Sequence, residues 1–188
     1  MRLPPIRIRT RLGKGPLAAL YGEQDPFCYT SSGTRAEPLT TVSVFEATPQ
    51  ETVAHWHYVA FGLRDRFGLE LTFRLARREG AVPDWPVTLL QRFARHVVES
   101  GVPFEEGHYL CLPEPVDPDG TLRCAALVRD PELRESEVPL YYQVVALHER
   151  ELSRMSEDGW TALIARLAAA TPLFVTRPGR AALPAWAE

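Results

Sequence analysis

Two histidines separated by one residue are the first candidates for chemistry in this sequence. His55 and His57 flank Trp56 in the run HWHYVAFGL. Alternate residues of a strand point to one face, so the two imidazoles could hold one metal ion, with Cys111, His108 or a carboxylate completing its shell. HxH alone is a weak signal, and no second pair of ligands at metal-like spacing accompanies it. We therefore expect two structural histidines held by hydrogen bonds and no bound metal.

The cysteines are the second candidates. They are Cys28, Cys111 and Cys124, an odd number without CxxC spacing, which favours neither a disulfide framework nor a zinc knuckle. Cys111 could form a nucleophilic pair with His96 or His108, since catalytic partners need to be close only in space. It lies, however, in the apolar run YLCL. Reduced, mostly buried and unreactive thiols are therefore expected.

Acid–base and cofactor signatures are weak. The acidic pairs Glu105-Glu106 and Asp117/Asp119 lie in segments with Gly and Pro, where solvated turn carboxylates are usual. The sequence contains no P-loop, GxGxxG, GxSxG or HExxH motif, and so indicates no catalytic residue and no cofactor. A metal- or thiol-dependent enzyme is kept as the alternative hypothesis, with the two histidines of HWH and Cys111 as its residues.

Composition bounds the class of protein. The chain has 188 residues, with 21 Lys or Arg against 24 Asp or Glu and a net charge of −3. Its 45% hydrophobic content suits one globular domain, and its 17 scattered prolines argue against a long helical bundle. No apolar run approaches the ~20 residues of a membrane-spanning helix, and no apolar stretch of a secretory signal is visible. We expect a cytoplasmic protein that does not bind membranes.

Charge is uneven along the chain. Five basic residues precede the first acidic residue, namely Arg2, Arg7, Arg9, Arg11 and Lys14. The rest of the chain is acidic, whereas nucleic-acid-binding domains are usually basic throughout, so no nucleic acid is expected as a partner. The predicted organisation is a basic arm at 1–15, flexible or forming an edge extension, a domain at 16–183 and a tail at 184–188.

The residues with chemical potential must be positioned by a mixed set of strands and helices. Strands are predicted at 40–46, 55–63, 69–77, 108–112, 122–128, 139–147 and 172–176, and helices at 17–22, 86–100, 149–155 and 157–170, with a loop at 23–39. This order predicts an α+β (α/β layered) fold, a single domain with a mixed β-sheet and helices packed on it.

Individual elements carry more detailed predictions. Strict alternation at 69–77 predicts a half-buried strand in a sheet with an exposed edge, and the apolar run YYQVVAL predicts a central strand. The helix at 86–100 should bury Phe93 and expose Gln91 and Arg92.

Aromatic residues are numerous enough to serve an interface as well as a core. The residues assigned a structural or partner-binding role are His55, Trp56, His57, Tyr58 and Trp85.

Several of these segments, in this order, resemble the suppressor of fused family. They are HWHYVAFGL at 55–63, ELTFRL at 70–75, DWPVTLLQRFARHVVESGVPFEEGHYL at 84–110, DPEL at 130–133, QVVAL at 143–147 and PLFVT at 172–176, preceded by LAALYGEQDP at 17–26 as in bacterial members. The resemblance covers nearly the whole chain. It implies a mixed α/β fold and no catalytic activity.

The same resemblance implies a protein partner. Animal members of the family bind Gli-type transcription factors in Hedgehog signalling, clamping a peptide strand between this domain and a second one, for which this sequence has no counterpart. A bacterial stand-alone domain, resembling immunity proteins that neutralise toxins, is the closer likeness. Only RDRFGL at 64–69 replaces the family's longer insert, and loops carry specificity, so we expect a different partner, a toxin or a peptide strand.

Overall fold

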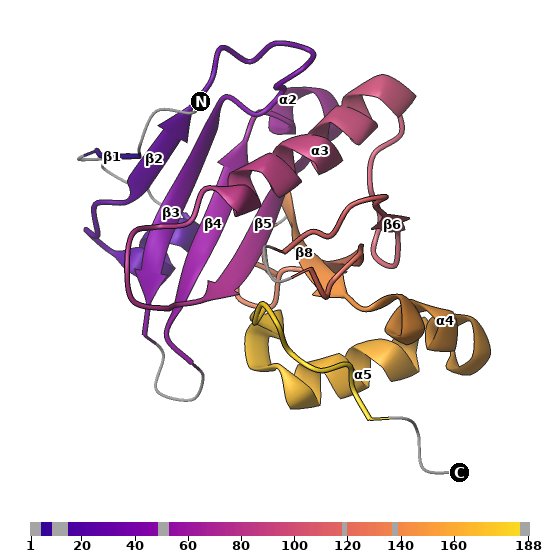
Figure 1. Cartoon of the computed structure of the whole chain (residues 1–188). Helices are drawn as coiled ribbons and strands as arrows, with labels where there is room; N and C mark the ends of the chain where they lie inside the picture. Colours follow the sequence, from indigo (N-terminus) through magenta and orange to yellow (C-terminus); the bar gives the residue numbers. More distant parts are fainter. Residues whose placement is uncertain (1–4, 9–14, 49–52, 118–119, 137–138, 185–188) are drawn as a thin grey trace.

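A computed structural model describes residues 5–8, 15–48, 53–117, 120–136 and 139–184 of the chain. Eight strands in these ranges form a single sheet in the order β1-β2-β3-β4-β5-β8-β7-β6 (Figure 1). They are β1 (Ile6–Arg7), β2 (Phe27–Thr30), β3 (Thr41–Ala47), β4 (His55–Phe61), β5 (Leu69–Ala76), β6 (Tyr109–Cys111), β7 (Cys124–Arg129) and β8 (Leu140–Leu147). Neighbours are antiparallel except β5 and β8, which are parallel, so the sheet is mixed.

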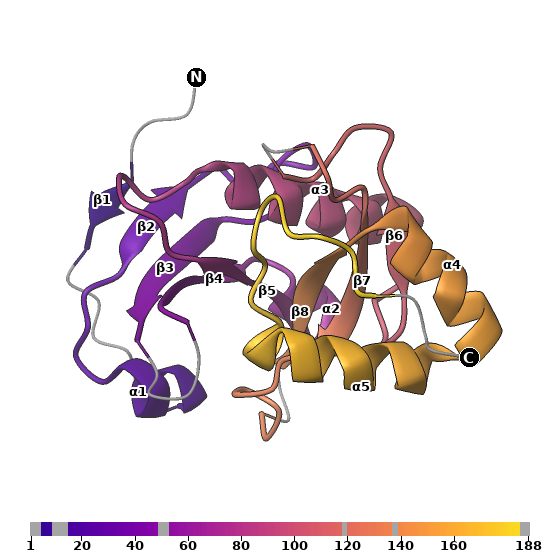
Figure 2. The same ribbon diagram turned by 60° about the horizontal axis from the view of Figure 1, so that its bottom comes forward.

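Helices cover both faces of the sheet. They are α1 (Pro16–Tyr21), α2 (Arg64–Phe67), α3 (Trp85–Ser100), α4 (Glu149–Asp158), α5 (Trp160–Ala170) and the short 3-10 helix η1 (Pro172–Phe174). Helix α3 lies on one face, whereas α1 and α5 lie on the other (Figure 2). The predicted α+β fold, a single mixed sheet with helices packed on it, is therefore confirmed. None of the helices in the described ranges is long and apolar enough to span a membrane.

The α3 face holds the larger core. Apolar residues recur at helical spacing along α3, and Leu90, Phe93 and Val97 are fully buried against strand residues such as Tyr58 and Phe73. Pro86 lies in the first turn, where its missing N–H costs no hydrogen bond, and Gly101 ends the helix in the left-handed region. Packing of these side chains holds α3 across β4 and β5.

One polar residue of α3 corrects the prediction for this helix. Gln91 is buried, because its side chain accepts a hydrogen bond from the Leu39 N–H at 3.1 Å and donates one to the Leu39 carbonyl at 3.0 Å. A buried amide that pairs with both backbone groups of a neighbouring segment is satisfied without solvent. Arg92 is partly exposed, as expected.

The opposite face holds two separate apolar clusters. One joins Leu17 of α1 to Phe45, Val59, Leu133 and Tyr141. The other joins strands β7 and β8 to α5 and η1 through Cys124, Ala126, Val128, Val145, Leu147, Leu163, Leu167 and Phe174. The polar residues of β4, β5 and β8 on this face lie between the two clusters and are equally buried. Burial on both faces makes β5 a central, fully covered strand, which contradicts the predicted half-buried strand near an exposed edge.

Two further predictions are wrong in part. The segment 23–39 contains β2, which the loop prediction missed because Phe27–Thr30 is too short for a periodic pattern. The segment 172–176 is η1 followed by a single bridge between Thr176 and Leu75, and is not a regular strand. Leu173 and Phe174 both have positive φ, a conformation that a strand excludes.

The basic arm is described only in part. Ile6–Arg7 forms β1 and pairs with β2 at one edge of the sheet, and Arg7 forms an ion pair with Glu46 at 2.7 Å. Arg2, Arg9, Arg11 and Lys14 lie outside the described residues, as do residues 185–188 of the tail.

Candidate functional site

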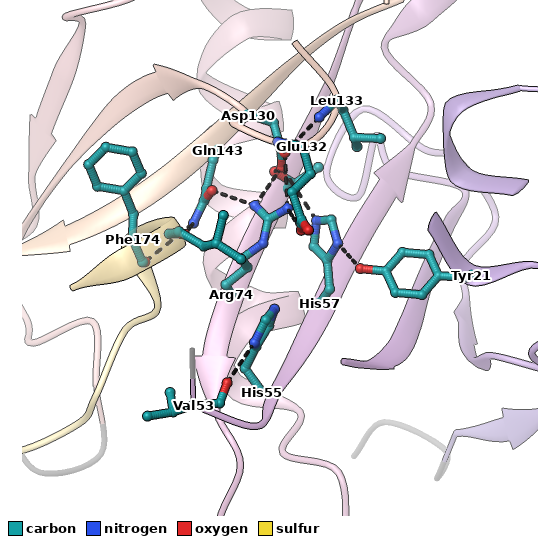
Figure 3. Close-up of polar contacts among 12 residues, drawn as sticks. Tyr21, Val53, His55, His57, Arg74, Asp130, Glu132, Leu133, Gln143 and Phe174 are labelled. Atoms are coloured by element: carbon teal, nitrogen blue, oxygen red, sulfur yellow. Dashed lines mark hydrogen bonds and ion pairs between the residues drawn. The ribbon is translucent and has the colours of Figure 1, made fainter. Parts of the chain in front are cut away.

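A buried ion pair lies at the centre of the face opposite α3. The guanidinium of Arg74, on β5, has no exposed surface, and it donates two hydrogen bonds to the carboxylate of Asp130 at 2.7 and 3.0 Å (Figure 3). The same group also donates to Glu132 at 2.8 Å and to the side-chain oxygen of Gln143 on β8. A buried arginine requires this number of partners, because an unpaired buried charge is strongly unfavourable.

The segment after β7 supplies the acidic half of this pair. Asp130 begins the run DPEL, and its carboxylate accepts hydrogen bonds from the backbone N–H groups of Glu132 at 3.0 Å and Leu133 at 3.2 Å. Thr72 of β5 donates its hydroxyl to the other carboxylate oxygen at 2.6 Å. Burial opposes ionisation of Asp130, but the charge of Arg74, together with the hydrogen bonds from His57 and Arg74, outweighs it and holds the pKa of the carboxyl well below its usual value.

His57 extends this cluster toward α1. Its Nε2 lies 3.4 Å from the Asp130 carboxylate, and the hydroxyl of Tyr21, the last residue of α1, donates a hydrogen bond to its Nδ1. Burial, with Arg74 second, lowers the pKa of His57 to about 4, so the imidazole is neutral near pH 7. Burial also raises the pKa of Tyr21, which keeps this hydroxyl a donor. His57 therefore connects α1 to the ion pair.

His55 lies on the same face of the sheet, two residues before His57 on β4. Its Nδ1 donates to the carbonyl of Val53 at 3.0 Å, and burial lowers the pKa of this histidine as well. Among the residues that the structure describes, no three or more His, Cys, Asp and Glu side chains are placed to hold a metal ion. The arrangement can hold β4, β5, β8 and α1 together. The side chains of His57, Arg74 and Asp130 have no exposed surface that a ligand could contact.

The other predicted site residues lie on the α3 face. Trp56 and Tyr58 are buried, and Tyr58 donates its hydroxyl to the carbonyl of Pro83 at 2.7 Å. Trp85 begins α3 and packs edge-on against Phe73. The alternation of β4 thus separates His55 and His57 from Trp56, Tyr58 and Trp85, and the five residues do not form one site. Their structural or partner-binding role stays a prediction.

The cysteines correct the prediction of reduced, buried thiols. Cys111 and Cys124 are directly opposite each other on β6 and β7, with their Cα atoms 4.1 Å apart, and form a disulfide. Cys111 is exposed, and only Cys28 remains a buried free thiol. Sequence spacing could not reveal this pair, because the register of β6 on β7 decides which residues face each other.

The disulfide also removes the basis for the alternative enzyme site. The strand that carries Cys111 is four strands from the one that carries His55 and His57, a separation of roughly 19 Å in a sheet of ordinary spacing. The acidic pairs considered in the sequence do not complete such a site either. Glu105 and Glu106 are exposed, whereas Asp117 is buried and accepts backbone hydrogen bonds from Thr121 and Leu122. The turn role predicted for Asp117 holds, but its predicted solvation is wrong. Asp119 lies outside the described residues.

Strand β6 confirms the strand predicted at 108–112, but the sequence patterns did not predict that this strand lies at an accessible edge of the sheet. Leu127 donates its N–H to the His108 carbonyl, and Leu112 donates its N–H to the Arg123 carbonyl, so residues 108 and 112 direct their backbone groups toward β7. Because backbone groups alternate along a strand, those of Tyr109 and Cys111 point away from the sheet. Tyr109 is 47% exposed. The sequence marks a strand here, but the pattern of three residues does not show which neighbours the strand has in the sheet.

A groove runs beside this edge, between α3 and β6. It has a volume of about 480 Å³, and its walls are Arg92, Arg95, His96 and Glu99 of α3 and residues 110–114. Arg92 faces Glu114 across it at 3.5 Å. The groove therefore combines apolar surface with charges of both signs next to free backbone hydrogen-bonding groups.

The model of the family described as Suppressor of fused protein (SUFU) matches residues 35–181, most of the chain. This chain belongs to the suppressor of fused family. The human and mouse Suppressor of fused homologs are each 32% identical to it over 143 residues, which cover 62% of this chain and 30% of the relative. The SUFU chain described here thus spans less than a third of the length of these curated relatives.

Solved structures share the SUFU fold. Drosophila Suppressor of Fused superposes with a TM-score of 0.77 at 23% identity, covering 88% of this chain and 49% of that one. A chain of the Sufu–Fu complex gives a TM-score of 0.76 at 22% identity, with 88% of both chains covered. A putative SUFU homolog from Neisseria gonorrhoeae gives 0.68 at 16% identity, covering 89% and 92%. At these identities the likeness concerns the fold.

Proposed function

We propose that this SUFU domain is a non-enzymatic protein-binding module that accepts an extended segment of its partner as an added strand on β6. The observation that carries the proposal is the position of β6 as the last strand of the sheet among the described residues, where the backbone groups of Tyr109 and Cys111 point away from β7. An unpaired edge offers a row of donors and acceptors to another strand, and this is a recurring mode of peptide recognition.

The groove beside the edge supports the same function. Side chains of an added strand alternate between two faces, and those directed toward α3 would enter the space lined by Arg92, Arg95 and His96. Backbone pairing with β6 would supply affinity, while this groove would select the side chains. A similar fold in a solved Sufu–Fu complex supports a role in binding proteins.

The class of partner is a finer proposal. We infer a bacterial immunity or antitoxin-like role, in which the chain binds and inhibits a toxin in the cytoplasm. The similar fold of a Neisseria gonorrhoeae homolog supports a bacterial setting, and the net charge of −3 favours a basic target because complementary charge speeds association. Such a complex should weaken as salt is added.

The test compares two substitutions at one position. Tyr109→Pro removes the N–H that points away from the sheet and leaves the ladder to β7 intact, whereas Tyr109→Ala removes the same side chain and keeps that N–H. Partner captured from the source cells is identified by mass spectrometry, produced separately, and titrated against both variants. Equal melting temperatures of the two variants would show that both are folded.

We expect the wild type and Tyr109→Ala to bind one protein with similar affinity and at near-equal stoichiometry. Tyr109→Pro should lose most of the affinity for this protein. Equal binding by the two variants would exclude β6 as the docking edge. Turnover of a small molecule by the wild type, abolished by His57→Gln without loss of folding, would contradict the non-enzymatic assignment.

A further inference from the structure

We propose that Cys111 is a site of reversible thiol–disulfide exchange with low-molecular-weight thiols, and that opening the Cys111–Cys124 bond loosens β6 and weakens docking. The inference rests on the proposed function, because it concerns control of the same edge. A disulfide in a cytoplasmic protein is typically redox-sensing, while structural disulfides belong to oxidising compartments.

The bond lies at the docking edge itself. Cys111 is one of the two residues of β6 whose backbone groups point away from the sheet, and its side chain is joined to Cys124 on β7. The Cα separation of 4.1 Å identifies the two residues as a non-hydrogen-bonded pair, in which the side chains of neighbouring strands approach most closely. The disulfide therefore replaces a side-chain contact at a position where the ladder has no hydrogen bonds.

The two halves of the disulfide differ in exposure. Cys111 is an exposed residue of the edge strand, whereas Cys124 is fully buried against Leu147, Leu163 and their neighbours. A thiol entering from solvent therefore meets Cys111 first. This asymmetry predicts which cysteine carries the mixed disulfide.

The exchange balances in two steps. A thiolate attacks Sγ of Cys111, forms a mixed disulfide there, and the S–S bond breaks with its electron pair on Sγ of Cys124, which takes up a proton. A second thiolate attacks the outer sulfur of the mixed disulfide and releases Cys111 as a thiolate. The protein disulfide gains two electrons, and two small thiols are oxidised to their own disulfide. Glutathione is a small thiol of this class.

Strand β6 is sensitive to the bond because the strand is short and pairs on one side. The strand has three residues and pairs with β7 alone among the described strands, and Leu110 between its two outward residues is only partly buried. A short strand offers few ladder hydrogen bonds, so its order is sensitive to a single covalent link. Reduction should therefore free the edge locally and leave the central sheet intact.

Cys28 provides an internal control. It is a buried free thiol on β2, near the other edge of the sheet, and its Sγ lies 3.6 Å from the hydroxyl of Ser43. A native protein equilibrated with glutathione should exchange at Cys111 while Cys28 stays unmodified until the chain unfolds.

The first experiment follows the chemistry without any partner. Folded wild type is equilibrated in reduced and oxidised glutathione, quenched with acid, alkylated, and weighed by mass spectrometry. We expect one two-electron transition, with glutathione trapped on Cys111 in Cys124→Ala and trapped about tenfold more slowly on Cys124 in Cys111→Ala. A disulfide that exchanges only after global unfolding, or equal trapping in the two variants, would overturn the inference.

The second experiment follows the edge. Hydrogen exchange is measured on oxidised and reduced wild type, and on Cys111→Ser, which cannot form the bond. The N–H groups of Leu110 and Leu112, which point toward β7, should exchange about tenfold faster in the reduced protein and in the variant, while those of β4 and β5 stay unchanged. Unchanged exchange at β6 would show that the bond does not order this strand.

Binding separates this inference from the proposed function. If Tyr109→Pro abolishes binding of the purified partner but reduction leaves its affinity unchanged, docking on β6 stands and redox control fails. If Tyr109→Pro and Tyr109→Ala bind equally, the proposed docking edge fails, and redox control of docking fails with it. If both reduction of the disulfide and Tyr109→Pro lower the affinity for the partner, the result supports docking on β6 as well as its redox control.

Discussion

The neutral state of His57 can be tested through the pH dependence of stability. Burial lowers the pKa of this imidazole from about 6.5 to about 4 in the folded protein. The unfolded chain therefore binds more protons in this range, and the stability that His57 contributes is complete above the unfolded pKa and lost as the pH falls toward the folded one. Between about pH 7 and about pH 5 the two pKa values imply a loss of about 2 kcal/mol from this residue.

Glu70 has the opposite effect over the same range. It is buried, and its carboxylate accepts hydrogen bonds from the backbone N–H groups of Gly62, Leu63 and Arg64, but burial outweighs them and raises the pKa to about 7. The folded protein then holds a proton that the unfolded chain has released, so stability rises by about 2 kcal/mol between about pH 7 and about pH 5. In wild type, Glu70 therefore offsets the loss of stability that His57 causes between these pH values.

Replacement of His57 by glutamine removes one of the two opposing effects. His57→Gln should be less stable than wild type at about pH 7, because the contact with Tyr21 is lost, but it should gain about 2 kcal/mol relative to wild type on acidification to about pH 5. His55 and Asp130 remain in both proteins and do not contribute to the difference.

Urea unfolding at the two pH values measures this effect directly. His96→Gln, at an exposed position of α3, is the matched control for the loss of one imidazole. Parallel pH dependences of wild type and His57→Gln would refute the reasoning, since they would mean that His57 binds protons equally well in the folded and unfolded chain. The same result would show that burial beside Arg74 does not hold this histidine neutral.

Two other substitutions test the two faces of the sheet. Phe93→Ala should lower the free energy of unfolding by about 3–5 kcal/mol, because Phe93 is fully buried, while Arg92→Ala on the same helix should change it little; denaturant titration that shows equal, small effects would contradict the core assigned to α3. Asp130→Asn should cost about 3–5 kcal/mol, since it removes the fully buried carboxylate from the Arg74 guanidinium and leaves the partly exposed Glu132 as its charged partner, and a melting temperature equal to that of wild type would disprove the role of this pair.

The sequence predicted well those features that depend on residues close together in the chain. Helical spacing predicted that Phe93 is buried, and alternation correctly divided Trp56 and Tyr58 from His55 and His57. These patterns follow from backbone geometry alone, which is why one segment is enough to recognise them.

Features that need a distant partner were not predictable. Arg74 alternates with apolar residues in the strand that was predicted to be half-buried, yet Asp130, 56 positions away, neutralises it in the interior. Gln91 is buried because it pairs with Leu39 across 52 positions. In each case a polar residue on the predicted wet face finds a buried partner, and no periodic pattern shows this.

The candidate site divides in the same way. His55 and His57 were found because HxH on a strand is a local pattern, but their partners Tyr21 and Asp130 come from other elements. The accessible edge at β6 and its disulfide depend on strand register, which three residues are too few to specify.

The parallel pairing of β5 with β8 has a consequence for how the chain folds. Strands β1 to β5 form one block and strands β6 to β8 a second block, and within each block antiparallel neighbours are consecutive in sequence. The pairing of β5 with β8, called the seam below, joins the two blocks and aligns Thr72 with Gln143. Contacts between distant residues close slowly, because the loop entropy is lost before the contacts form. Until the seam closes, β5 and β8 are unpaired edges that can associate with other chains, and Arg74 has not met Asp130. The rate at which β5 pairs with β8, rather than the rate at which either block of strands forms, should therefore limit folding. It should also determine how much of the newly made protein aggregates.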